Sequence, residues 1–138
     1  LRVAADDYLA RLGRYATVEE REVKEASRAP TMPAQRREEA ARLRERIPAG
    51  ARVVALDGGG KGWSSEELAH RLDDWRGTSR PTTFLVGGSH GLDRELVAAA
   101  DERWSLGALT LPHELARVVV LEQLYRGFTI LRGEPYHK

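Results

Sequence analysis

Residues 51–68, ARVVALDGGGKGWSSEEL, contain the pattern that decides the fold. An apolar run typical of a buried strand ends at Asp57, and a glycine-rich turn, GGGKGW, follows it. Ser64 is then placed to cap a helix, and Glu67, three residues further on, completes a capping box. A strand, a turn and a capped helix in this order predict the first half of a parallel βαβ unit.

The C-terminal half of the sequence repeats this order. Apolar strands are predicted at residues 82–88 (TTFLVGG) and 103–106 (RWSL), and helices at 64–76 and 93–101 precede them. A long helix of about 18 residues should start near His113. Three strands that alternate with helices favour an α/β fold with a mainly parallel sheet.

The N-terminal part is more polar. Helical spacing predicts helices at residues 3–15 and 34–47, the second with Pro33 in its first turn. TVEEREVKEA (17–26) is read as a short, exposed edge strand. The total of 138 residues suits one domain, so we expect residues 1–138 to form a single domain.

The composition excludes several classes of protein. Cysteine is absent, which rules out disulfides and thiolate metal sites and favours the reducing cytoplasm. None of the four histidines shows a metal-ligand spacing, so we expect no metal. Apolar runs such as residues 118–121 are far shorter than the roughly 20 residues of a membrane span, so no membrane partner is expected. The net charge of +1 gives no strong positive field of the kind that would indicate binding to nucleic acid.

Glycine-bearing turns follow all three predicted strands, at residues 57–62, 87–91 and 107–112. Ligands of parallel sheets bind beyond the carboxyl ends of the strands, so these turns should converge on one site. The third turn is unusual because residues 106–112, LGALTLP, carry no charge. Its backbone N–H and C=O groups, framed by apolar side chains, suit a flat nucleoside-like ligand.

A second interpretation of the middle turn is enzymatic. GGSHG (87–91) matches G-x-S-x-G between a strand and a helix, the context of a nucleophile elbow. Ser89 would be the nucleophile of a small serine hydrolase, with acids and histidines following in the required order, namely Asp93 or Asp101 and His113 or His137. Alternatively, the glycines only let the backbone approach a ligand closely. Phosphate-loop and dinucleotide spacings fail at both glycine-rich turns.

The last predicted helix is apolar on more than one side, through Leu115, Val118, Val119, Leu121, Leu124, Tyr125 and Phe128. This exceeds the single stripe that a surface helix needs. A symmetric homodimer explains the excess, and a central core helix is the alternative.

Several stretches together resemble a known family. LD..GK..SSEELA, VGG..G, WSL..LTLPHELARVVVLEQLYRG and the closing PYHK are similar to the large-subunit ribosomal RNA pseudouridine N3-methyltransferases, the RlmH type of SPOUT enzyme. The resemblance covers about residues 1 to 138 and is densest over 105–138. Members usually begin with a short strand and a Gly-Lys turn, so we expect a native N-terminal strand to be missing here.

The resemblance implies a single-domain SPOUT fold: a parallel-rich sheet with helices on both faces, a C-terminal trefoil knot and a homodimer. Such knots are rare exceptions among protein folds. The implied cofactor is S-adenosylmethionine. The family's cofactor-binding positions correspond to Leu56, Gly87, Gly88, Leu106, Ala108, Leu109, Thr110, Leu111, Pro112 and His113.

The implied reaction is methylation of N3 of a pseudouridine in 23S ribosomal RNA within the assembled 70S ribosome of the cytoplasm. Removal of the N3 proton calls for a base or for a cation that stabilises the anion. We assign His137 as proton acceptor or relay, Arg126 as anion stabiliser and Tyr136 as a stacking partner of the base. A non-catalytic ribosome-binding module is the alternative besides the hydrolase.

Overall fold

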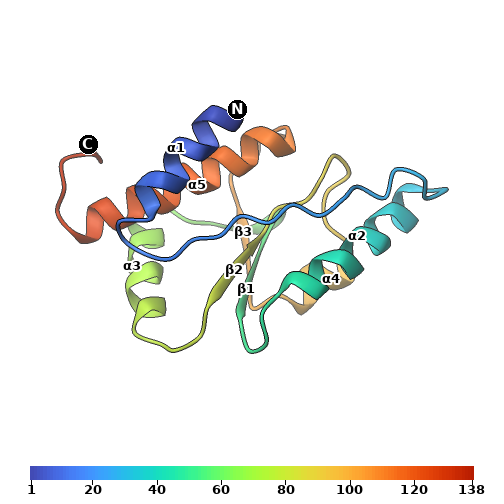
Figure 1. Cartoon of the computed structure of the whole chain (residues 1–138), viewed down its shortest axis with the longest axis horizontal. Coiled ribbons are helices and arrows are strands. Elements are labelled where there is room, and N and C mark those ends of the chain that lie inside the picture. The colour runs from blue at the N-terminus through green and yellow to red at the C-terminus, as the bar shows by residue number, and fades with distance from the viewer. The chain divides into compact units, whose positions relative to one another are not determined.

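The computed structural model describes all residues, 1–138 (Figure 1). The chain divides into two compact units. The helical unit comprises Leu1–Glu20, Trp63–Ser79 and Glu114–Lys138, and the sheet unit comprises Arg21–Gly62 and Arg80–His113. The predicted single domain stays a prediction. No helix is both long enough and apolar enough to span a membrane.

The sheet unit contains three parallel strands in the order β2-β1-β3 (Figure 1). They are β1 (Arg52–Gly62), β2 (Thr82–Leu85) and β3 (Glu102–Ser105). In the register, Val54 of the central strand lies opposite Phe84 on one side and Glu102 on the other. The predicted α/β fold with a parallel sheet is therefore confirmed.

Strand β1 is longer than predicted, because the GGGKG stretch continues the strand instead of forming a turn. Leu56 and Lys61 both lie opposite Trp104, so the residues between them bulge and the pairing with β3 then resumes. A Cβ at Gly60 would lie 2.6 Å from the backbone of Arg103. The glycines of β1 thus allow its backbone to approach that of β3 closely. The predicted turn at this place was therefore wrong.

Helices α2 (Met32–Arg46) and α4 (Arg94–Ala99) pack on the sheet of this unit, through a core cluster that includes Ala40, Ala55, Leu85, Leu96 and Val97. Each helix starts at a side-chain cap: Thr31 accepts from the amide of Ala34, and Asp93 accepts from that of Leu96.

The predicted edge strand at 17–26 is absent from the structure. The backbone of this segment is bound by side chains instead of a neighbouring strand. Arg42 donates to the carbonyl of Lys24, and the buried carboxylate of Glu39 accepts from the amide of Ala26 at 2.9 Å. These bonds take the backbone groups that a sheet ladder would use, so the prediction was wrong.

The helical unit consists of α1 (Arg2–Leu12), α3 (Ser65–Arg76) and most of α5 (His113–Leu131). Helix α1 lies along α5 (Figure 1). The rings of Tyr8 and Tyr125 join the two helices, with centroids 6.0 Å apart and ring planes tilted by 45°. Helix α3 begins with the predicted capping box of Ser64 and Glu67. Every residue of α5 is buried or half-buried, so the core-helix alternative accounts for much of its apolar surface.

Helix α5 meets α3 at Gly127. A Cβ at this glycine would lie 2.6 Å from Cδ1 of Leu72 and 3.7 Å from Cα of Ala69. The missing side chain therefore sets how closely the two helices approach, because packed interiors have no spare volume.

In the sheet unit, Asp57 of β1 is tied to α4. Its carboxylate accepts from Arg94 at 2.7 Å and from the amide of Gly59 at 3.1 Å. The hydrogen bond from Arg94 lowers the pKa of Asp57, against the opposing effect of burial.

Replacing Gly127 by Val should destabilise the protein by about 1–3 kcal/mol, the usual penalty for overpacking a core. Denaturant unfolding measures this loss. The matched control is Gly58→Val, whose Cβ meets no atom within 4 Å and should change stability by no more than about 0.5 kcal/mol. Adding Leu72→Ala should recover part of the loss, whereas a strictly additive double variant would contradict the assigned collision.

Arg94→Gln should raise the pKa of Asp57 toward its ordinary value, as measured by carbon NMR of the carboxyl group. Because the folded pKa is depressed, the pair contributes stability above the unfolded pKa of about 3.9 and loses it as pH falls through the folded value. The stability gap between wild type and variant should stay below about 1 kcal/mol, since Arg94 is largely exposed, and should close in acid. A gap that persists below pH 2 would refute the pairing.

Candidate active site

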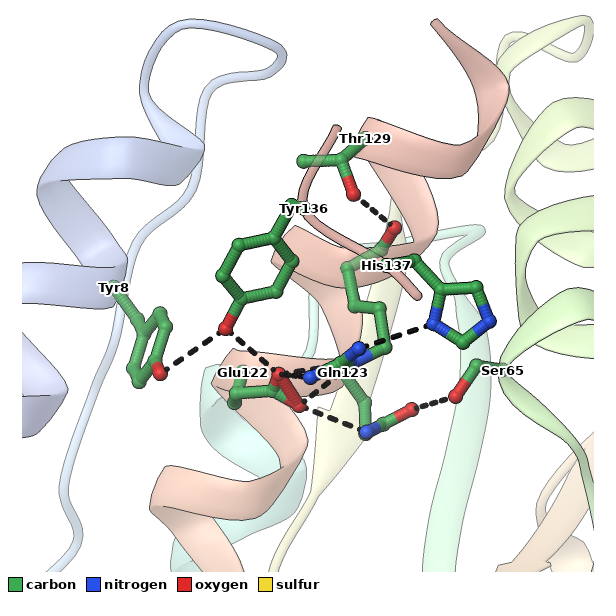
Figure 2. Close-up of polar contacts among 8 residues, drawn as sticks. Tyr8, Ser65, Glu122, Gln123, Thr129, Tyr136 and His137 are labelled. Atoms are coloured by element: carbon green, nitrogen blue, oxygen red, sulfur yellow. Dashed lines mark hydrogen bonds and ion pairs between the residues drawn. The ribbon is translucent and has the colours of Figure 1, made fainter. Parts of the chain in front are cut away.

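The three residues assigned to the chemical step, His137 as proton acceptor, Arg126 as anion stabiliser and Tyr136 as stacking partner, gather in the helical unit. Arg126 lies on α5, and Tyr136 and His137 lie in the C-terminal tail that follows this helix (Figure 2). The guanidinium of Arg126 lies 4.8 Å from the ring centroid of Tyr136, and its Nη1 lies 3.0 Å from Nδ1 of His137. The tail thus folds back over the helix and brings these side chains into contact.

Glu122, one turn before Arg126 on α5, is the anionic centre of this cluster. Its carboxylate accepts from Nε of Arg126 at 3.1 Å and forms an ion pair with Nη2 at 3.0 Å. The amide of Gln123 donates to the other oxygen at 2.8 Å, and Ser65 donates to the oxygen of Gln123 at 2.7 Å (Figure 2). The hydrogen bond to Glu122 raises the pKa of Arg126, which stays charged.

Tyr136 is held as a hydrogen-bond donor. Its hydroxyl donates to Glu122 at 3.1 Å, so its oxygen accepts from Tyr8 of α1, 3.4 Å away (Figure 2). Burial, followed by the bond with Tyr8 and the negative charge of Glu122, raises the pKa of Tyr136 far above its usual range. The phenol therefore stays protonated at neutral pH and is unsuited to act as a base.

The two ring nitrogens of His137 have different partners. An arginine only donates, so Nδ1 must accept from Arg126, which leaves the proton on Nε2. That nitrogen donates to Glu66 of α3 at 2.7 Å. The hydrogen bonds therefore assign a neutral imidazole protonated at Nε2, with the lone pair of Nδ1 covered by Arg126.

Sequence reasoning missed Tyr8, Glu66 and Glu122 in this cluster. The spacing of Glu122 and Arg126, four residues apart on a helix, was a visible signal for an ion pair. Tyr8 and Glu66 are distant in sequence from the tail, 128 and 71 residues away from their partners, and carried no signal.

The residues assigned to the cofactor lie in the sheet unit, one within a strand and the others beyond the ends of two strands. Leu56 lies on β1, Gly87 and Gly88 follow β2, and Leu106–Pro112 follow β3. Because the strands are parallel, their carboxyl ends share one edge of the sheet.

The turn after β2 is a tight one. Gly91 has a φ of +77° and donates its amide to the carbonyl of Gly88 at 3.0 Å. A Cβ at Gly87 would lie 2.7 Å from the backbone of Gly91, so the turn closes only with glycine at this position. Carboxylate oxygens of Glu25 and Glu39 lie beside Gly88, 3.4 and 3.5 Å from where its Cβ would be.

The turn after β3 presents its backbone to solvent. Residues 107–110 are exposed, with Leu109 83% accessible, and the amides of Ala108–Leu111 donate to no backbone carbonyl. Gly107, with a φ of +125°, reverses the chain, and its amide is bound by the hydroxyl of Ser105 at 3.2 Å. His113 follows as the first residue of α5.

Ser89, the nucleophile of the alternative hydrolase, lies in the turn between β2 and α4. The hydroxyl of Ser89 donates to the carboxylate of Glu25 at 3.3 Å, and the structure records no imidazole as its partner. No group of three or more histidine, aspartate or glutamate side chains is gathered as metal ligands.

Comparisons with known proteins agree in pointing to methyl transfer. A family model described as "Predicted SPOUT methyltransferase" matches residues 1–137. A protein of Sorangium cellulosum named "Ribosomal RNA large subunit methyltransferase H" is 44% identical over 137 residues, which cover 99% of this chain and 88% of that protein. Proteins of the same name from Rubrobacter xylanophilus and Polynucleobacter asymbioticus are 53% and 43% identical to this chain. These matches cover 96% and 98% of this chain and 86% and 87% of the two proteins. With a family match over nearly its whole length and relatives this similar, the chain belongs to the SPOUT methyltransferase family and is an enzyme that transfers methyl groups.

Proposed function

We propose that the chain methylates large-subunit ribosomal RNA, with S-adenosylmethionine as methyl donor and N3 of a pseudouridine as acceptor. The observation that carries this proposal is the similarity, at 43–53% identity over almost the full chain, to proteins named as large-subunit ribosomal RNA methyltransferases. The proposed donor rests on the loops after β2 and β3 of the sheet unit, and the proposed acceptor atom rests on Arg126, Tyr136 and His137 of the helical unit.

The turns of the sheet unit fit a nucleoside-containing methyl donor. The amides of Ala108–Leu111 lack backbone partners and are framed by exposed apolar side chains, which suits a flat, partly apolar ligand. The glycines after β2 leave their backbone accessible to a close approach. We assign cofactor binding to Leu56, Gly87 and Gly88, and to the loop from Leu106 to His113.

S-adenosylmethionine, when bound, supplies an electrophilic methyl group, so the protein needs no covalent intermediate. The task of the chain is alignment, which can lower a barrier by several kcal/mol when the reacting atoms are held in line. The tail cluster, defined as Arg126, Tyr136 and His137, is assigned to accept the N3 proton and to stabilise the negative charge that remains on the base.

The hydrogen bonds of His137 define what this proton transfer requires. Nδ1 is its only nitrogen with a lone pair in the assigned tautomer, and Nη1 of Arg126 covers it. For His137 to accept the N3 proton, Arg126 must release Nδ1, which frees a guanidinium donor for the anionic imide oxygen of the base. Tyr136, packed against Arg126, then offers a ring face for stacking.

The proposal includes a homodimer that acts on the 70S ribosome in the cytoplasm. Leu115, Val119 and Phe128 of α5 are only half-buried within one chain, which leaves apolar surface for a second copy. A trefoil knot, as the family resemblance implies, is part of the same proposal.

Gly88→Val should abolish binding of S-adenosylmethionine, because its branched side chain covers the backbone that the ligand must reach. Isothermal titration calorimetry measures this loss against one site per wild-type chain. Gly88→Ala is the matched control, since its Cβ would make only ordinary contact with Glu25, 3.4 Å away. Unchanged affinity in the valine variant would refute the pocket. No binding by the wild type would favour the hydrolase or a ribosome-binding module, which fluorophosphonate labelling of Ser89 tells apart.

His137→Ala should abolish methyl transfer to ribosomes while leaving the affinity for S-adenosylmethionine unchanged, because the side chain is assigned to the proton and not to the cofactor. Transfer of a tritiated methyl group to ribosomes that lack the modification measures the activity. Simultaneous loss of cofactor binding would mean that the tail has a structural role only.

A further inference from the structure

Glu122 is a mostly buried carboxylate that the proposed reaction does not use. Its side chain is 17% exposed, and it lies on α5 between the helix core and the C-terminal tail. A buried carboxylate is expensive unless donors compensate its charge. Here the donors are Arg126, Gln123 and Tyr136, so the compensation comes largely from groups assigned to the reaction.

The geometry leaves each donor little freedom. Arg126 uses Nε and Nη2 on the carboxylate, a two-point contact that fixes the plane of the guanidinium. The remaining nitrogen, Nη1, is thereby directed to Nδ1 of His137. Tyr136 is oriented by its hydroxyl, which donates to the same oxygen that Arg126 contacts.

The carboxylate is itself held in place. The amide of Gln123 donates to Oε1, and the hydroxyl of Ser65 fixes the orientation of that amide by donating to its oxygen (Figure 2). Tyr8 extends the chain of hydrogen bonds to α1. Hydrogen bonds from α1, α3 and α5 thus lead to the carboxylate of Glu122. This carboxylate in turn binds Arg126 and Tyr136 of the tail cluster.

We propose that Glu122 is a positioning residue for methyl transfer: it orients Arg126 and Tyr136, and through Arg126 it fixes His137 as the tautomer protonated at Nε2. This inference rests on the proposed function. Glu122 is not assigned to contact the cofactor or the RNA base. Its proposed role is to determine which atoms of Arg126 and His137 can stabilise an anion or accept a proton.

The tautomer of wild-type His137 gives a first test that needs no variant. Nitrogen NMR of protein labelled at histidine should show protonation at Nε2, and the guanidinium of Arg126 should give separate Nη signals because its rotation is blocked. A proton on Nδ1, or a freely rotating Arg126, would overturn the proposal.

Glu122→Gln is the second test, because the amide has the same shape but no charge and accepts at only one atom. We expect His137 to sample both tautomers and kcat to fall roughly 10–100-fold, the usual effect of losing a group that orients a functional residue. The affinity for S-adenosylmethionine should not change. Glu122→Asp, which keeps the charge, should recover part of kcat.

The matched control is Asp7→Asn, which removes an exposed carboxylate that also pairs with an arginine four residues away. It should leave kcat and the His137 tautomer as in the wild type. Wild-type kcat and tautomer in Glu122→Gln would refute the positioning role, as would a parallel fall of kcat and cofactor affinity.

Failure of the proposed function has a different signature. If wild-type protein neither binds S-adenosylmethionine nor methylates ribosomes, the function is wrong whatever the tautomer. If Arg126→Ala and His137→Ala inactivate the enzyme but Glu122→Gln does not, the function stands and the positioning role is wrong.

Discussion

Parallel pairing of β1 with a strand on each side is the constraint on which the arrangement of the chain depends. Parallel neighbours cannot be joined by a tight hairpin, so each connection between them must be long. Both connections contain a helix, α3 between β1 and β2 and α4 between β2 and β3 in the sequence. All three strands then end at the same edge of the sheet, and the turns after β2 and β3, which are assigned to the cofactor, leave from that edge.

A second constraint is electrostatic and belongs to the helical unit. The negative charge of Glu122 and the positive charge of Arg126 are held at contact distance in a half-buried place, where their attraction exceeds that of an exposed pair. This pairing limits what Arg126 can do, because a guanidinium committed to one carboxylate has few donors left. Its remaining nitrogen, Nη1, is hydrogen-bonded to Nδ1 of His137. His137 can therefore accept a proton at Nδ1 only after this hydrogen bond is broken.

Family membership and structure contribute different parts of the functional argument. Similarity to methyltransferases over nearly the whole chain establishes the class of enzyme but assigns no task to an individual side chain. The structure supplies individual contacts: Nη1 of Arg126 lies 3.0 Å from Nδ1 of His137, Nε of Arg126 donates to Glu122, and the amides of Ala108–Leu111 donate to no backbone carbonyl. The proposed reaction combines the two: the loops of the sheet unit are assigned to the cofactor, and Arg126, Tyr136 and His137 of the helical unit are assigned to the acceptor base and its proton.

The sequence by itself determined the order of the three parallel strands and their helices, the cap at Ser64, and the apolar loop before α5, because each depends on residues close together in the chain. Local signals failed where distant groups competed for the backbone. The glycines of β1 signal a turn, but their lack of side chains lets the strand pass against Arg103 and continue. Residues 17–26 have the sequence pattern of a strand, but Glu39 and Arg42 of α2 form the hydrogen bonds with their backbone that a neighbouring strand would form. Only the tertiary structure placed Tyr8, Glu66 and Glu122 around the tail, because hydrogen bonds between helices depend on packing that no local spacing encodes.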